Sequence, residues 1–276
     1  MKTYSRVLTV AGSDSGGGAG IQADIKAISA TGSYAASTIT AVTVQNTVGV
    51  IDVFPVPATV VAAQIDAVLS DIGADAVKIG MLHSSQVILA IAAKLAEYQA
   101  RNIVLDPVMV STSGHRLIEE AAVETLLDAL IPMARVITPN IPEAEILAGE
   151  RISGGEDLPR IARKLSLDGK VSVLMKAGHL SGDELTDYFY NAEEDHIIEL
   201  KSSRCDTPNT HGTGCTLSSA FASYLAQGLT LDDAARASKA YIAAAIESGS
   251  HYSIGHGHGP VNHFWAAMDG EVHRNR

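Results

Sequence analysis

The sequence has few of the features that mark secreted, membrane or zinc-binding proteins. Its 276 residues include two cysteines, Cys205 and Cys215, which are too few for a disulfide scaffold and lack the paired spacing of a zinc site. The longest nearly uncharged stretch, Val53 to Ala63, contains two prolines and is too short to cross a bilayer. The apolar run that precedes Gly12 is also too short for a secretory signal. These absences predict a reduced, cytoplasmic protein without a membrane segment.

Positive charge is scarce as well. The chain has 20 lysines and arginines against 31 aspartates and glutamates, a net charge of −11. This balance argues against nucleic acid or an anionic membrane as a partner, and a phosphorylated substrate needs a local positive site. Apolar residues make up 46% and charged residues 18% of the chain, which excludes disorder.

Short β-like runs and helical patterns alternate along the whole chain. Parallel strands are predicted at Val7–Val10, Ile39–Val44, Ala76–Ile79, Ile103–Leu105, Val136–Thr138 and Val171–Lys176. Two runs with polar edges, Leu185–Tyr190 and His196–Leu200, predict an antiparallel hairpin at the sheet edge. No linker, composition break or repeat divides the sequence. We therefore predict one α/β domain over residues 1–276, with a doubly wound, mainly parallel sheet covered by helices on both faces.

Ligands of such sheets bind beyond the carboxyl ends of the strands. Polar or glycine-rich residues recur at these ends, namely Gly12–Gly20, Gln45, Gly80–Met81, Asp106, Asn140, Glu143 and Lys176. Their recurrence from strand to strand predicts a shared crevice.

The segment Gly12–Gly20 lies between a predicted strand and a predicted helix. Glycines let backbone N–H groups approach a ligand, and the helix start attracts negative charge. The segment is not a Walker A loop, because no Gly-Lys-Ser/Thr follows. It also misses the dinucleotide spacing, and the second strand ends in Gln45 instead of an acid, which disfavours a dehydrogenase. A tight turn without a ligand remains the alternative.

The segment Asn209–Thr216 directly precedes an apolar helix. Gly212 and Gly214 free the backbone to turn its N–H groups inward, and the helix dipole adds about half a positive charge. This predicts a cradle for a transferring phosphoryl group, with Cys215 in the first turn, where thiol pKa values fall. The alternative is a helix capped by Thr213. Cys205 is predicted to be a packing residue.

The segment Thr138–Glu145 follows another strand. Asn140 can cap the next helix, and Glu143 can hold a magnesium ion with Asp106 as a second carboxylate, because magnesium needs only one or two carboxylates besides phosphates. Lys176 ends an apolar strand, which favours a phosphate contact over a sheet-edge lysine. The spacing of His256 and His258 resembles a metal site, but the glycine between them favours a surface loop.

Together these segments resemble the hydroxymethylpyrimidine/phosphomethylpyrimidine kinases, thiamine-biosynthetic members of the ribokinase superfamily. The resemblance extends from about Val7 to His263 and rests on Ala11–Asp24, Lys78–Met81, the Asn140/Glu143 motif and Asn209–Cys215. It implies a ribokinase-like fold, ATP and Mg²⁺ as cofactors, and hydroxymethylpyrimidine and its monophosphate as substrates. A homodimer is expected.

The resemblance also implies roles for individual residues. The anion hole and catalytic groups would be Gly212, Thr213, Gly214, Cys215 and Lys176, with Cys215 standing where sugar-kinase relatives have an aspartate base. The pyrimidine would lie against Gln45, Asp24, Gly12, Ala19, Met81 and Val108. Asn140, Lys176 and Thr210 would contact the nucleotide, and Glu143 and Asp106 the metal.

Two alternatives remain open. A pyridoxal kinase would use the same scaffold, since both substrates are substituted aromatic heterocycles that carry a hydroxymethyl group. An inactive nucleotide-binding regulatory protein is the alternative of a different class. The presence of Lys176, Glu143 and Cys215 together weighs against it.

Overall fold

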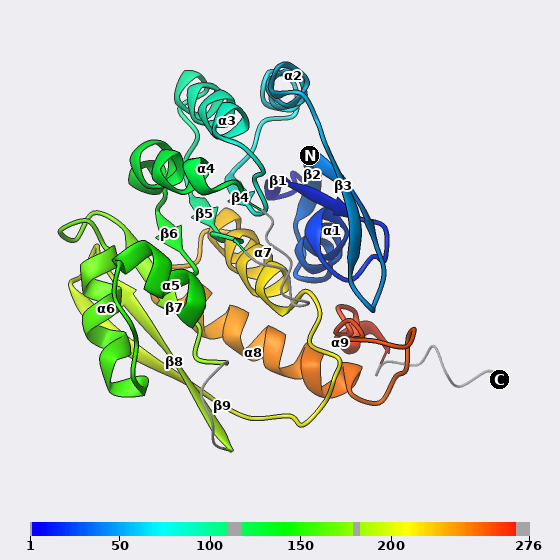
Figure 1. Ribbon diagram of the computed structural model, residues 1–276, viewed down its shortest axis with the longest axis vertical. Coiled ribbons are helices and arrows are strands. Elements are labelled where there is room, and N and C mark those ends of the chain that lie inside the picture. The colour runs from blue at the N-terminus through cyan, green and yellow to red at the C-terminus, as the bar shows by residue number, and fades with distance from the viewer. Residues whose placement is uncertain (1, 110–117, 179–182, 269–276) are drawn as a thin grey trace.

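The protein has a nine-stranded sheet with helices on both faces (Figure 1). The computed structural model describes residues 2–109, 118–178 and 183–268. The strands are β1 (Arg6–Asp14), β2 (Tyr34–Gln45), β3 (Val50–Pro55), β4 (Ala76–Ile79), β5 (Ile103–Leu105), β6 (Val136–Ile137), β7 (Ser172–Met175), β8 (Glu184–Asn191) and β9 (His196–Ser203). The helices are α1 (Gly20–Ala30), α2 (Ala58–Leu69), α3 (Ser85–Glu97), α4 (Glu120–Thr125), α5 (Ile141–Ala148), α6 (Leu158–Leu165), α7 (Thr213–Ala226), α8 (Leu231–Gly249) and α9 (Trp265–Met268).

The strand order is β3-β2-β1-β4-β5-β6-β7-β8-β9. Strands β2, β1 and β4 to β7 run parallel, whereas β3 and the β8–β9 hairpin pair antiparallel at the two edges. The chain first moves outward from β1 to β2 and then returns to build the other half from β4. The carboxyl ends of β1 and β4 therefore form a topological switch point, where ligands of such sheets bind. The predicted doubly wound α/β fold with an antiparallel edge is confirmed.

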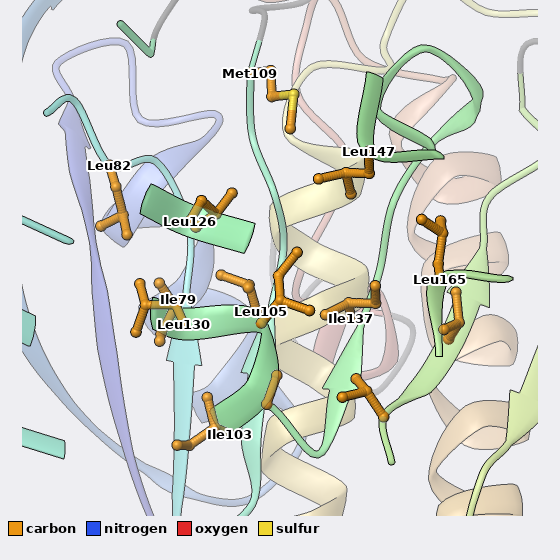
Figure 2. Close-up of a cluster of buried hydrophobic side chains, with 14 of the residues drawn as sticks. Ile79, Leu82, Ile103, Leu105, Met109, Leu126, Leu130, Ile137, Leu147 and Leu165 are labelled. Carbon is orange, nitrogen blue, oxygen red and sulfur yellow. The ribbon is translucent and has the colours of Figure 1, made fainter. Parts of the chain in front are cut away.

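The core has two layers because successive side chains of a strand point to opposite faces. Leu8, Val77 and Ile79 face α2 to α6, whereas Val7 and Ala76 belong to the layer against α7 and α8. Figure 2 shows the first layer, in which strand residues meet helix residues such as Leu126 and Leu147. Packing on both faces holds the strand ends in fixed positions.

Several segments differ from the sequence prediction, and β1 extends to Asp14, into the predicted turn Gly12–Gly20. Strand β3 was not predicted, since it is an exposed edge strand that ends in Pro55 and has no apolar alternation to mark it. The spacing of Val123, Leu126, Leu127 and Leu130 predicts one helix, whereas the structure has α4 continued by a wider π-helical turn over Leu126–Leu130. A 3₁₀ turn over Ile131–Met133 follows, where Pro132 lacks the N–H that a continued α-helix needs.

The surface agrees with the sequence analysis where the two can be compared. His256 and His258 lie in an exposed loop, as predicted. Within the described residues, none of the helices is long and apolar enough to span a membrane.

Candidate active site

A cavity of about 590 Å³ lies at the carboxyl ends of the strands. The structure brings fourteen of the fifteen predicted site residues to its wall, all except Asp24. They are Gly12, Ala19, Gln45, Met81, Asp106, Val108, Asn140, Glu143, Lys176, Thr210, Gly212, Thr213, Gly214 and Cys215. The shared crevice predicted from the strand ends therefore exists.

Asp24 is fully buried and lies away from this wall. Its two carboxylate oxygens accept hydrogen bonds from Lys78 Nζ at 2.8 and 2.9 Å, from Thr9 Oγ1 at 2.5 Å and from Ser219 Oγ at 2.8 Å. Burial lowers the pKa of Lys78, but the nearby acidic groups, Asp24 first among them, together outweigh this effect and the net pKa is raised. Asp24 is thus the counter-ion of a buried lysine, and the predicted pyrimidine contact is corrected.

The predicted anion-hole turn, residues 212–215, forms the start of α7. Gly212 is the N-cap residue with φ of +79°, and no side chain caps the helix, so the alternative role of Thr213 as a cap is wrong. A Cβ on Gly212 would lie 1.8 Å from the carbonyl oxygen of Gly18. Glycine is therefore required here both by the backbone conformation and by the close approach of the first glycine-rich loop. An uncapped helix start that faces a cavity is a favourable position for a phosphoryl group.

Lys176 supplies the positive charge beside this turn. Its Nζ lies 2.8 Å from Asp106 Oδ1 and 4.0 Å from Glu143 Oε2. A Cβ on Gly214 would lie 3.1 Å from the same nitrogen, which places Lys176 directly against the anion-hole turn. Burial lowers the pKa of Lys176, but the Asp106 and Glu143 carboxylates raise it by a larger amount. The net pKa is raised, so the ammonium group stays charged. This is the local positive site that a phosphorylated ligand requires in an acidic protein.

Glu143 takes part in the helix cap that the sequence predicts at Asn140. It forms a capping box with Asn140, whose Oδ1 accepts from Glu143 N at 2.9 Å while Glu143 Oε2 accepts from Asn140 N at 2.8 Å. The same carboxyl group is buried on the cavity wall. Burial raises its pKa to about 7, Lys176 opposes the shift, and Asp106 adds to it. A divalent cation would relieve this cost, and two carboxylates suffice for magnesium, so Glu143 and Asp106 fit such an ion.

Cys215 lines the cavity in the first turn of α7, as predicted. Its pKa is not lowered. Burial raises the pKa of the thiol to about 11, although the Lys78 cation opposes the shift. The cost of desolvating a thiolate at this position is larger than the stabilisation that the helix start provides, so Cys215 is a neutral thiol at pH 7.

Sequence reasoning missed the pair formed by Asp14 and His211. The Asp14 carboxylate accepts from the backbone N–H groups of Gly16, Gly18 and Ala19 at 2.8 to 3.0 Å, and lies 3.0 Å from His211 Nε2. Burial raises the pKa of Asp14, but these hydrogen bonds outweigh it and the net pKa is lowered. The carboxylate is thus ionised and can only accept, so His211 Nε2 carries a proton. Both residues stand in motifs quoted from the sequence, but no local signal links positions 197 residues apart.

The Gln45 amide lies beside this pair, with its Nε2 3.2 Å from His211 Nε2 and its Oε1 3.1 Å from Thr43 Oγ1. The Nε2 proton of His211 is given to Asp14, and the Thr43 hydroxyl lies 2.9 Å from Ser13 O. One amide N–H and one lone pair of the amide oxygen remain for a ligand in the cavity.

A second wall of the cavity comes from β8, β9 and α8. Lys239 Nζ lies 2.8 Å from Asp187 Oδ2, and Asp187 Oδ1 accepts from Ala177 N at 2.7 Å, so this pair fixes the backbone next to Lys176. Apolar side chains complete the wall, among them Leu185, Ile242 and Ile246. Cys205, predicted to be a packing residue, also lines the cavity. This wall was not predicted from the sequence, because its residues come from elements without a motif.

Residues 14–262 match the model of the phosphomethylpyrimidine kinase family. The chain belongs to this family. It is 50% identical over 258 residues to the hydroxymethylpyrimidine/phosphomethylpyrimidine kinase of Rhizobium meliloti, covering 93% of this chain and 96% of that protein. It is 52% identical over 263 residues to the thiamine biosynthesis bifunctional protein of Geobacter sulfurreducens. That match covers 95% of this chain and only 53% of the relative, so the chain spans about half the length of the bifunctional protein.

Among solved structures, the ADP complex of Bacillus subtilis pyridoxal kinase superimposes with a TM-score of 0.88 at 34% identity, covering 96% of this chain and 100% of that one. The ribokinase-like fold and the membership of a kinase family of thiamine biosynthesis, both expected from the sequence motifs, are confirmed.

Proposed function

We propose that this protein transfers the γ-phosphoryl group of ATP to the hydroxymethyl group of 4-amino-5-hydroxymethyl-2-methylpyrimidine, and then phosphorylates the monophosphate. One observation carries the proposal. A single cavity joins the anion-hole turn, Lys176 and Cys215 to the Gln45 amide. The free N–H and free lone pair of that amide complement an aminopyrimidine edge, which offers a ring-nitrogen acceptor beside an amino donor.

The nucleotide would lie with its phosphates against the anion-hole turn and Lys176. Asn140 and Thr210 would line its path, and the apolar side chains of β8 and α8 would cover the nucleoside. The ADP complex of the Bacillus subtilis pyridoxal kinase supports nucleotide binding on this fold. When bound, magnesium would be held by Glu143 and Asp106 and would neutralise phosphate charge.

The phosphoryl transfer depends mainly on positioning and electrostatics. The backbone N–H groups of the anion-hole turn and the Lys176 ammonium group stabilise charge on the moving phosphoryl group. Cys215, in the first turn of α7, would accept the proton of the substrate hydroxyl in its thiolate form, which is the minor form at pH 7. In the second phosphorylation the nucleophile is a phosphate oxygen, which is already an anion and needs no base.

The two alternatives are less well supported. A pyridoxal kinase shares the fold, but the identity to that neighbour is 34%, against 50% to a full-length pyrimidine kinase. Pyridoxal also has no amino group beside its ring nitrogen, the pair that suits Gln45. Lys176, Glu143 and Cys215 all line one cavity, which argues against an inactive regulatory protein.

The deciding experiment is a comparison of turnover on hydroxymethylpyrimidine, its monophosphate and pyridoxal with saturating ATP and magnesium. We expect both pyrimidines to be phosphorylated with a higher kcat/KM than pyridoxal. Preferential turnover of pyridoxal would favour the first alternative, and no turnover of any of the three would favour the second.

We further propose that the protein is a cytoplasmic homodimer. Strand β3 is an edge strand, and the adjacent face exposes Val42, Val44 and Phe54, the last at 69% of its surface. A second copy of the chain would cover this apolar face. Sedimentation equilibrium is the test: the wild type should be dimeric and Val44→Lys shifted towards monomer. A monomeric wild type would contradict the proposal.

A further inference from the structure

The segment after α8 returns across both glycine-rich loops of the active site. We call residues 255–263 the strap. His258 N donates to Thr47 O at 2.9 Å, and Gly259 O accepts from His211 N at 3.0 Å. A Cβ on Gly259 would lie 2.1 Å from Asn209 Oδ1, so the strap lies in contact with the segment that leads into the anion-hole turn.

The strap ends in His263, which is 4% exposed. Its backbone oxygen accepts from Tyr241 Oη at 2.7 Å, and its ring Nε2 lies 3.0 Å from Thr216 Oγ1. The Thr216 hydroxyl is 2.8 Å from Gly212 O, a carbonyl oxygen that can only accept. Thr216 therefore donates its proton to Gly212 and accepts from His263 Nε2–H. A chain of two buried hydrogen bonds links the imidazole ring to the anion-hole turn.

Gly212 is the residue of this turn that most needs an external restraint. It is a glycine with φ of +79°, and glycine has the widest backbone freedom. Its carbonyl and the N–H of Thr213 belong to one rigid peptide plane, so holding the carbonyl also sets the direction of that N–H. Thr216 holds the carbonyl with both its backbone N–H, at 2.9 Å, and its hydroxyl. The strap thus restrains the Gly212–Thr213 peptide through His263 and Thr216, and the Thr210–His211 peptide, which precedes Gly212, through Gly259.

We propose that His263 is a positioning residue for phosphoryl transfer, which acts through Thr216 to hold the Gly212 peptide of the anion hole. The inference rests on the proposed function in that this turn receives the transferring phosphoryl group. Burial lowers the pKa of His263 to about 4, with a smaller contribution from the Lys26 cation, so the ring stays neutral and keeps a single N–H at the pH of the assay. That N–H is the one given to Thr216.

Three variants separate positioning from packing. His263→Leu removes the donor and keeps most of the bulk, and His263→Gln offers a side-chain N–H at a similar reach. Val261→Ala is the matched control, because this buried strap residue packs in the core layer beside α7 and α8. Each variant is assayed for kcat, for both KM values and for thermal stability, with whichever hydroxymethyl substrate the wild type phosphorylates.

We expect His263→Leu to lower kcat about 5- to 30-fold, the value of one buried hydrogen bond, with both KM values within about twofold. His263→Gln should recover most of the loss. Val261→Ala should lower the melting temperature and leave kcat unchanged. Wild-type kcat in His263→Leu would overturn the role, as would a glutamine variant as poor as the leucine variant, or an equal loss of kcat in Val261→Ala.

If His263→Leu fails to fold, the same chain of hydrogen bonds is tested at Thr216, its middle residue. Thr216→Val removes the hydroxyl and Thr216→Ser keeps it, so the valine variant should lose kcat and the serine variant should not. Equal kcat in the two would contradict the inference. Failure of the wild type to phosphorylate any pyrimidine contradicts the proposed function instead, so the two failures are distinguishable.

Discussion

The state of the Cys215 thiol predicts an unusual pH dependence for the first phosphorylation. Burial raises its pKa to about 11, so the thiolate fraction is about 10⁻⁴ at pH 7 and about 10⁻² at pH 9. If the thiolate accepts the hydroxyl proton, kcat/KM for hydroxymethylpyrimidine should rise about 100-fold between these two pH values. Since the pKa is raised, the active form becomes more abundant as the pH increases and reaches no plateau below pH 9.

The assay follows phosphorylation of the alcohol and of its monophosphate side by side from pH 7 to pH 9. The monophosphate needs no base, so its rate should change little. Glu143, with a pKa of about 7, adds at most about a twofold rise in this range. Cys215→Ala should lower turnover of the alcohol by about 10²- to 10⁴-fold and remove the slope, while turnover of the monophosphate suffers less.

Two results would refute this reasoning. A flat profile for the alcohol above pH 8 in the wild type would show that no group with a pKa near 11 acts as the base. A slope that persists in Cys215→Ala would assign the base to another residue.

Three further predictions follow from the same contacts. Because protons compete with a cation for Glu143, the magnesium concentration for half-maximal activity should rise about fivefold from pH 7 to pH 6. The variant Glu143→Gln should need more magnesium at both pH values, and its requirement should not depend on pH. An unchanged magnesium requirement in a folded variant would leave Glu143 as a capping residue only. Gln45→Leu should lower kcat/KM for hydroxymethylpyrimidine about 5- to 150-fold and affect pyridoxal much less; equal losses on both substrates would exclude its recognition role. Lys78→Met leaves the Asp24 carboxylate buried without its cation and should cost about 3–5 kcal/mol in the free energy of unfolding. Most of that cost should return in the double variant Lys78→Met/Asp24→Leu, as measured by urea denaturation, and a double variant as unstable as the single one would argue against the pairing.

The positions that the sequence predicted well carry local signals. The strand Ile103–Leu105 is an apolar run bounded by Asn102 and Asp106, and its ends follow directly from these boundaries. In a parallel sheet the carboxyl ends of the strands meet at one edge, so Asp106, Asn140 and Lys176 were expected together before any contact was known.

The positions that the sequence predicted poorly depend on distant partners. Asp24 pairs with Lys78, which is 54 residues away in the sequence, and does not line the cavity. Cys215 has the local environment of an acidic thiol at a helix start, but the surrounding sheet and helices bury it and reverse the sign of the pKa shift. The roles of Asp14 and His211 arise only when the two glycine-rich loops meet.

Gly18 and Gly212 leave the ribosome at different times. A Cβ on Gly212 would collide with the Gly18 carbonyl, and a Cβ on Gly18 would lie 2.4 Å from the His211 ring, so each loop shapes the other. The two glycines are 194 residues apart, which at about 5–20 residues per second separates their synthesis by about 10–40 s. During this interval β2 to β9 are synthesised, while the phosphate site is absent. A nascent chain interrupted before residue 211 would therefore hold all nine strands of the sheet and no means of binding a transferring phosphoryl group.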